Sequence, residues 1–120
     1  MNLGLEGKRA VVLGASKGLG AAIAIGLANE GTLVVGAARS VDAITALNDR
    51  VTGTGAITAL RLDLSDASSV QSFIDTIVAD GGADILVNNS GGPAPGEASA
   101  LPASDYAAAF TTMVTPLINI

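Results

Sequence analysis

Short apolar runs alternate with longer amphipathic segments along most of this chain. The apolar runs, each short enough for a buried strand, cover residues 9–14, 32–37, 56–62 and 84–88. Apolar residues at helical spacing indicate helices over residues 18–30, 41–52 and 66–79. Uniformly apolar strands separated by helices are typical of a parallel sheet covered on both faces. The pattern therefore predicts an α/β fold with right-handed crossovers.

Each predicted helix has an apolar face. In the first helix this face consists of Leu19, Ile23 and Leu27. In the second helix it is weaker and consists of Val41, Ile44, Leu47 and Val51. In the third it consists of Val70, Phe73, Ile74, Ile77 and Val78. Ser65 is the expected N-cap of the third helix.

The C-terminal part of the sequence continues the pattern. Residues 89–100 are rich in Gly, Pro and Ser and indicate a loop. A last helix is predicted from near Pro102, and its apolar positions are Tyr106, Phe110, Met113 and Leu117. The sequence ends at "TPLINI", inside this apolar pattern. We expect residues 1–120 to be the front part of a longer protein, and the alternative is a complete small α/β domain.

Composition narrows the classes of function. The chain has 120 residues, of which 49% are hydrophobic, and this suits a single globular domain. The net charge of −5, with six basic residues, argues against binding to nucleic acid or an anionic membrane. Cysteine and histidine are absent, which excludes a thiolate nucleophile, a disulfide, a zinc finger and a His-based triad, and no metal site is predicted. Because we find no signal peptide or membrane span, we expect a cytoplasmic protein.

The stretch "GASKGLG", residues 14–20, lies between the first predicted strand and the first helix. A glycine turn there can bring backbone N–H groups and the positive end of a helix against a phosphate. The spacing G-x-x-x-G-x-G is neither G-x-G-x-x-G nor a Walker loop. A tight turn with close helix packing is the alternative, but the position after the first strand favours dinucleotide binding.

The residues at the end of the second predicted strand indicate which dinucleotide the site binds. Sites that prefer NAD usually place Asp or Glu there, whereas NADP sites use a cation. The residues here are "GAARS", which contain no acid, and Arg39 could bind a phosphate together with Lys17. This favours NADP(H), unless both cations are solvated surface charges.

Polar residues also follow the next two strands. Asp63 could accept a hydrogen bond from an adenine amino group, or it could serve as a turn or helix-cap residue. The stretch "NNSGG" could lie beside the ribose, or its asparagines could satisfy neighbouring strand ends. Carboxyl ends of parallel strands are where such a ligand binds.

Taken together, these motifs resemble those of the short-chain dehydrogenase/reductase family. Within the family they are most similar to the motifs of the β-ketoacyl carrier-protein reductases. "GASKGLG" resembles the family's T-G-x-x-x-G-x-G loop, "DL" at 63–64 its adenine-contacting Asp and the apolar residue after it, and "NNSG" at 88–91 its N-N-A-G. The resemblance implies a Rossmann-type doubly wound parallel sheet with strand order 3-2-1-4. It makes residues 1–120 the dinucleotide-binding portion of one domain.

By position, the resemblance implies a role for each of several residues. The pyrophosphate and adjacent ribose would be held by Gly14, Ser16, Gly18, Leu19 and Gly20. The 2′-phosphate would be bound by Lys17, Arg39 and Ser40. The adenine would be held by Asp63 and Leu64. The ribose and the path to the nicotinamide would be lined by Asn89, Ser90 and Gly91.

The chain departs from the family at catalytic positions. Met113 stands where many members have a helix asparagine that joins a proton relay, and a thioether cannot serve in the same way. The family's Tyr-x-x-x-Lys pair is absent, because Phe110 follows the only tyrosine, Tyr106, at the fourth position. Smaller departures are Leu13 for a threonine and Ser90 for an alanine. We therefore predict no catalytic residue within this chain.

The resemblance implies a longer parent enzyme that transfers a hydride between NADP(H) and a carbonyl or alcohol substrate. The parent would be a homodimer or homotetramer, and the 120 residues alone would be inactive. The alternative is a non-catalytic dinucleotide-binding module. A flavodoxin-like or receiver-like domain ranks last, since a receiver needs an acidic cluster that "VVLGAS" lacks.

Overall fold

A computed structural model describes residues 3–89 of the chain. Its elements are, in order, β1 (Arg9–Leu13), α1 (Gly18–Asn29), β2 (Leu33–Ala38), α2 (Val41–Ala46), the 3₁₀ helix η1 (Leu47–Arg50), β3 (Ala56–Arg61), α3 (Ala67–Ala79) and β4 (Ile85–Val87). All four predicted strands are present, and each of their ends lies within one residue of the predicted position. The loop and helix predicted beyond residue 89 lie outside the described residues.

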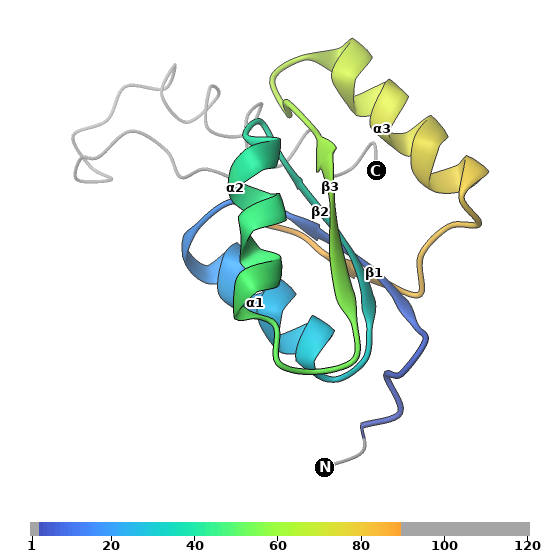
Figure 1. Cartoon of the computed structure of the whole chain (residues 1–120). Coiled ribbons are helices and arrows are strands. Elements are labelled where there is room, and N and C mark those ends of the chain that lie inside the picture. The colour runs from blue at the N-terminus through green and yellow to red at the C-terminus, as the bar shows by residue number, and fades with distance from the viewer. Residues whose placement is uncertain (1–2, 90–120) are drawn as a thin grey trace, which may run out of the picture.

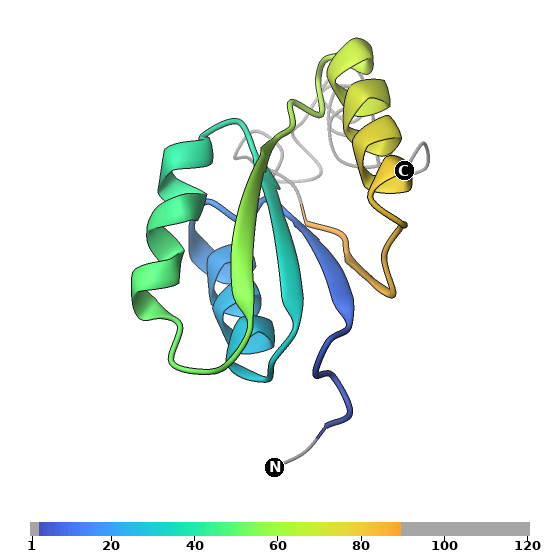
Figure 2. The same ribbon diagram turned by 45° about the vertical axis from the view of Figure 1, so that its right-hand side comes forward.

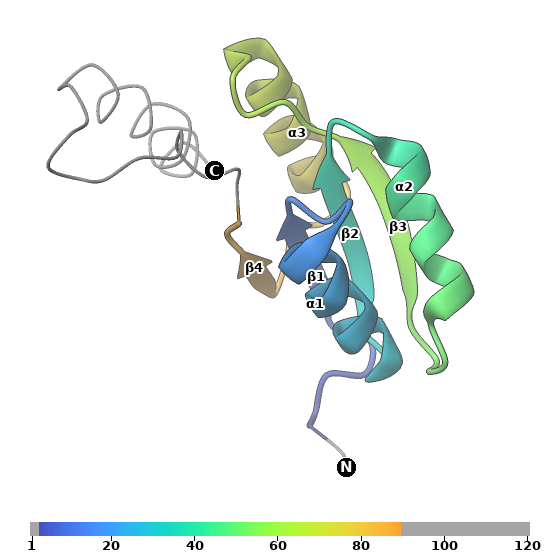
Figure 3. The same cartoon turned by 90° about the vertical axis from the view of Figure 1, so that its left-hand side faces the viewer.

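The strands form one parallel sheet in the order β3-β2-β1-β4, as predicted. In the register, Val11 pairs with Val35 on one side and with Leu86 on the other. Figure 1 and Figure 2 show α1 and α2 on one face of the sheet and α3 on the other. Figure 3 shows β4 at one edge, beside β1. The sheet is therefore doubly wound.

Two hydrophobic clusters explain this arrangement. Alternate residues of a strand point to opposite faces, and β1 is buried on both. Val12 belongs to the cluster beneath α1 and α2, which also holds Ala24 and Ile44. Val11 and Leu13 belong to the cluster beneath α3, together with Phe73. The uniformly apolar sequence of β1 thus follows from its central place between two helical layers.

The predicted apolar face of α1 is right for Ile23 and Leu27, which are partly buried against the core, and wrong for Leu19. Leu19 is 70% exposed. The buried positions of the helix are instead its small residues, Gly20, Ala21, Ala24 and Ala28. A Cβ on Gly20 would overlap the carbonyl oxygen of Gly14, so the backbone of α1 approaches the end of β1 very closely. Small side chains face the sheet because larger ones would push the helix away.

The second predicted helix is shorter than the sequence pattern indicates. It ends as α2 at Ala46 and continues only as a 3₁₀ turn to Arg50, and Val51 is extended. The side chain of Asn48 lies against the free edge of β3, where its Nδ2 donates to the carbonyl of Ile57 at 2.7 Å and its Oδ1 accepts from the N–H of Ile57 at 2.9 Å. This pairing satisfies backbone groups that a strand edge otherwise leaves open.

The predicted N-cap of α3 is also wrong. The cap is Asp66, whose Oδ1 accepts hydrogen bonds from the N–H groups of Ser68 at 3.0 Å and Ser69 at 3.4 Å. The hydroxyl of Ser65 is engaged elsewhere, as described below. The apolar face of α3 is otherwise as predicted, except that Val78 is 68% exposed.

Candidate functional site

The carboxyl ends of the strands open onto a cleft of about 450 Å³. It is lined by Gly14, Ser16, Lys17, Gly18, Ala37, Ala38, Arg39, Leu62, Asp63, Leu64, Ser65 and Asn89. These residues come from the loop after β1, the end of β2, the turn after β3 and the end of β4. In a doubly wound sheet, this edge is the usual place for a ligand.

The structure brings together most of the predicted site residues that it describes. Three of them, Leu19, Gly20 and Ser40, do not line the cleft. Ser90, Gly91, Met113 and Tyr106 lie outside the described residues.

Sequence reasoning missed Ala37, Ala38, Leu62 and Ser65. The first three carry apolar side chains at strand ends and leave no chemical signal. Ser65 did leave one, since Asp-x-Ser is a common turn sequence in which the serine bonds back to the aspartate.

The three glycines of "GASKGLG" have different structural roles. Gly14 has a φ of +62°, and a Cβ there would come within 2.9 Å of the Nδ2 of Asn89. Gly20 allows α1 to pack on Gly14, as described above. Gly18 also has a φ of +62°, but a Cβ there would meet nothing within 4 Å. Gly14 and Gly20 thus make a compact turn, whereas Gly18 keeps the loop conformation beside open space in the cleft.

The first turn of α1 is open to an anion. Lys17 at its N-cap forms no side-chain capping bond, and the first turn holds no acidic residue. The first N–H groups of a helix have no partner within the helix, and they lie at the positive end of its dipole. By contrast, Asp66 caps α3 with its carboxylate. The arrangement at α1 can therefore hold a phosphate group.

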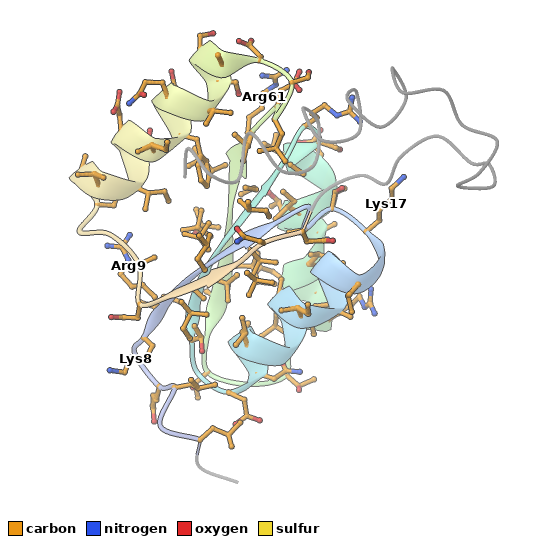
Figure 4. The ribbon with its side chains drawn as sticks, turned by 180° about the vertical axis from the view of Figure 1, so that it is seen from behind. Lys8, Arg9, Lys17 and Arg61 are labelled. Carbon is orange, nitrogen blue, oxygen red and sulfur yellow. The ribbon has the colours of Figure 1, made fainter. Side chains whose placement is uncertain are left out.

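Basic side chains flank the cleft where β2 ends. Lys17 and Arg39 both line it and are exposed. Figure 4 shows Lys17 projecting outward from the loop before α1, and Arg61 beside the segment that leads to α3. Ser40 caps α2 by position but forms no side-chain capping bond. The last residues of β2 and the two that follow carry no carboxylate, and Arg39 is the single charged residue among them.

Asp63 supplies the carboxylate of the cleft. Its Oδ1 accepts hydrogen bonds from the hydroxyl of Ser65 at 2.6 Å and from the N–H of Ser65 at 3.0 Å. These two bonds, the hydroxyl bond first, hold the pKa of Asp63 below its ordinary value of 3.8 against a smaller opposing effect of burial, and the positive charges of Arg39 and Arg61 lower it a little further. The carboxylate is therefore ionised at neutral pH and acts as an acceptor. Asp63 is a turn residue and lines the cleft as well.

Residues 3–89 hold neither a metal site nor a membrane-spanning helix. In that part of the chain, no group of His, Cys, Asp and Glu side chains is placed to hold a metal ion. No helix there is long and apolar enough to cross a bilayer.

Comparison with known proteins agrees with this geometry. The family model for short chain dehydrogenase matches residues 8–120. The 3-oxoacyl-[acyl-carrier-protein] reductase FabG of Escherichia coli is 42% identical over 90 residues, which cover 74% of this chain and 36% of the relative. The NADPH-dependent pterin aldehyde reductase of Arabidopsis thaliana is 42% identical over 82 residues, which cover 68% of this chain and 34% of the relative.

Solved structures show the same likeness. L-sorbose reductase from Gluconobacter frateurii, complexed with NADPH and L-sorbose, superposes with a TM-score of 0.84 at 29% identity, covering 99% of this chain and 46% of the reductase. A 3-oxoacyl (acyl-carrier-protein) reductase from Agrobacterium tumefaciens with NADP bound gives 0.81 at 32% identity, covering 96% of this chain and 45% of that protein. The chain thus spans less than half the length of these relatives. It belongs to the short-chain dehydrogenase/reductase family of oxidoreductases.

Proposed function

We propose that this chain binds NADP(H) in the cleft at the carboxyl edge of its sheet. In this proposal it is the cofactor-binding part of a reductase or dehydrogenase that acts on a small carbonyl or alcohol. The observation that carries the proposal is that Lys17, from the loop after β1, and Arg39, from the end of β2, line the same cleft, and that the end of β2 carries no carboxylate. When bound, the cofactor supplies a hydride to a carbonyl carbon or accepts one from an alcohol.

The glycine loop holds the pyrophosphate. The uncapped N–H groups at the start of α1 donate to its oxygens, and Gly18 leaves room for them because it has no side chain. The hydroxyl of Ser16, which lines the cleft, adds a donor beside the ribose. Leu19 and Gly20, which do not line the cleft, contribute only backbone N–H groups.

The 2′-phosphate lies between the loop and the end of β2. Arg39 can donate two parallel hydrogen bonds to it, and Lys17 adds a second positive charge. Ser40 has a hydroxyl that α2 does not use for capping. A carboxylate at the end of β2 would instead accept from a free 2′-hydroxyl and repel the phosphate, which is why its absence favours NADP(H) over NAD(H).

The adenine and the nicotinamide lie at opposite ends of the cleft. Asp63 accepts from the adenine 6-amino group, and Leu64 offers apolar contact to the ring. Asn89, which donates to the carbonyl of Gly14 at 3.5 Å, faces the ribose on the nicotinamide side. We place Ser90 and Gly91 on the same side from the sequence.

The relatives support an enzymatic role for the parent protein, since several are reductases and two of those compared bind NADPH or NADP. The printed sequence contains no Tyr-x-x-x-Lys pair, so we expect the 120 residues to bind the cofactor without turnover. The same absence favours a second candidate, a non-catalytic dinucleotide-binding module. For the reductase we further propose a cytoplasmic homodimer or homotetramer that contacts neither nucleic acid nor membrane.

Titration of the purified protein with NADPH and NADH tests the cofactor assignment. Arg39→Ala should weaken NADPH binding by about 1–3 kcal/mol, about fivefold to 150-fold, because a hydrogen-bonded charge is lost. NADH binding should change little. Arg50→Ala is the matched control, since Arg50 is exposed in η1 and does not line the cleft. Equal losses for NADPH and NADH would rule out the 2′-phosphate role of Arg39.

A second assay separates the reductase from the binding module. The full-length protein is mixed with NADPH and a set of small ketones and aldehydes, and the loss of absorbance from NADPH is followed. Substrate-dependent oxidation of NADPH supports the reductase. Saturable binding with no oxidation of NADPH by any carbonyl compound supports the module.

A further inference from the structure

The turn between β3 and α3 fixes the carboxylate of Asp63 in one orientation. Both hydrogen bonds from Ser65 go to the same oxygen, Oδ1. The backbone of Asp63 is held as well, because its N–H donates to the hydroxyl of Ser69 in α3 at 3.0 Å. Among residues 3–89, no hydrogen bond to the second oxygen, Oδ2, is found. One carboxylate oxygen thus serves the turn, and the other is free for a ligand in the cleft.

The bonds from Ser65 also hold the carboxylate against rotation toward two nearby cations. The positive charges of Arg39 and Arg61 act on Asp63, and both are exposed. A carboxylate free to rotate could pair with either guanidinium. Pairing with Arg39 would occupy both the acceptor for the adenine and the cation for the 2′-phosphate. Ser65, which lines the cleft, opposes this rotation because its hydroxyl donates to Oδ1 at 2.6 Å.

The same motif, an aspartate whose Oδ1 accepts from the serine two residues later, occurs again three residues further along the chain, where it has a different role. Asp66 Oδ1 accepts from the hydroxyl of Ser68 at 2.8 Å and from its N–H at 3.0 Å. This pair caps α3, and neither residue lines the cleft. The chain therefore contains two matched aspartate–serine turns, of which only the first faces the candidate site.

We propose that Ser65 is a positioning residue that presents Asp63 Oδ2 to the 6-amino group of adenine. Ser65 is then a determinant of the preference for adenine over a base that lacks this amino donor. The inference rests on the proposed function, since it requires that NADP(H) bind with its adenine beside Asp63. Ser65 acts through Asp63 and not through a bond of its own to the cofactor.

Dissociation constants for NADPH and for its 6-deamino analogue, in which a carbonyl replaces the amino group, test this role. The unmodified protein should bind NADPH more tightly than the analogue, because a carbonyl cannot donate a hydrogen bond to Oδ2. Ser65→Ala should weaken NADPH binding by about tenfold, the effect of a misplaced hydrogen bond to a charged group, and the analogue by less than about twofold. Ser65→Thr keeps a hydroxyl and should retain the preference. Ser68→Ala, the matched control, should leave both constants unchanged.

The outcomes separate this inference from the proposed function. If Asp63→Ala abolishes the preference for NADPH over the analogue but Ser65→Ala keeps it, the role of Ser65 is overturned and the site stands. Equal weakening of both ligands by Ser65→Ala also overturns it, because that pattern indicates only a structural role. If the unmodified protein shows no preference for NADPH over the analogue, or if Asp63→Ala retains that preference, the adenine contact itself is wrong. Both proposals about Asp63 are then overturned.

Discussion

Two glycines in α1 offer a matched test of how closely this helix lies on the sheet. Gly20 faces the sheet, and a Cβ there would overlap the carbonyl oxygen of Gly14 and lie 2.8 Å from its carbonyl carbon. Gly26 is exposed in the same helix, and a Cβ there would meet nothing within 4 Å. Replacing each by alanine changes helix propensity equally, so the difference between the variants isolates the contact with the end of β1.

The magnitudes follow from these contacts. Gly26→Ala should raise the free energy of unfolding by about 0.5–1 kcal/mol, since alanine favours a helix over glycine. Gly20→Ala receives the same gain but must displace backbone, and overpacking of this kind costs about 1–3 kcal/mol or more. The obstacle is the Gly14 carbonyl, which cannot move aside as a flexible side chain could. We therefore expect Gly20→Ala to destabilise the protein and Gly26→Ala to stabilise it.

Urea unfolding, monitored by circular dichroism, compares the free energy of unfolding of both variants with that of the unmodified protein. NADPH titration of the same samples adds a second readout, because displacement of the helix would also move the N–H groups that we assign to the pyrophosphate. Gly20→Ala should lose both stability and affinity, whereas Gly26→Ala should keep its affinity. A Gly20→Ala protein as stable as Gly26→Ala would refute the close approach of α1 to Gly14.

Three further perturbations follow from the hydrogen bonds of the fold. Asn48→Ala should lower the free energy of unfolding by about 1–3 kcal/mol, measured in urea, because it leaves the N–H and carbonyl of Ile57 unpaired at the edge of β3; an unchanged value would contradict that pairing. Asp66→Ala should cost about 1 kcal/mol in the same assay through loss of the α3 cap, and Asp66→Asn should recover most of it. The pKa of Asp63 is lowered first by the Ser65 hydroxyl, so the unfolded chain binds more protons near and below pH 3.8 and stability should fall as the pH drops through that range. Ser65→Ala should flatten this decline near and below pH 3.8, and an unaltered slope would contradict the assigned cause.

The sheet could be predicted because its strands are buried on both faces. Runs such as residues 9–13 and 33–38 contain almost only apolar side chains, and their alternation with helices permits few topologies. The candidate site could be located for the same reason, since Gly14, Arg39 and Asp63 each follow a strand and the strands are parallel. The carboxyl ends then meet at one edge.

The local errors have physical causes. α1 reads "GLGAAIAIGLAN", in which nearly every position is apolar, so hydrophobic periodicity cannot select a face and only the contact with Gly14 does. The early end of α2 depends on Asn48 pairing with β3, a contact between segments that the pattern does not encode. The cap of α3 was assigned one residue too early, because Ser65 and Asp66 are both good caps and only the turn geometry separates them.

The measurement that tests the central claim most directly is the affinity of the unmodified protein for NADPH and for NADH, at low and at high ionic strength. The account predicts that NADPH binds much more tightly and that its advantage shrinks as salt screens the 2′-phosphate from Lys17 and Arg39. Equal affinities at low salt, or tighter binding of NADH, would contradict it.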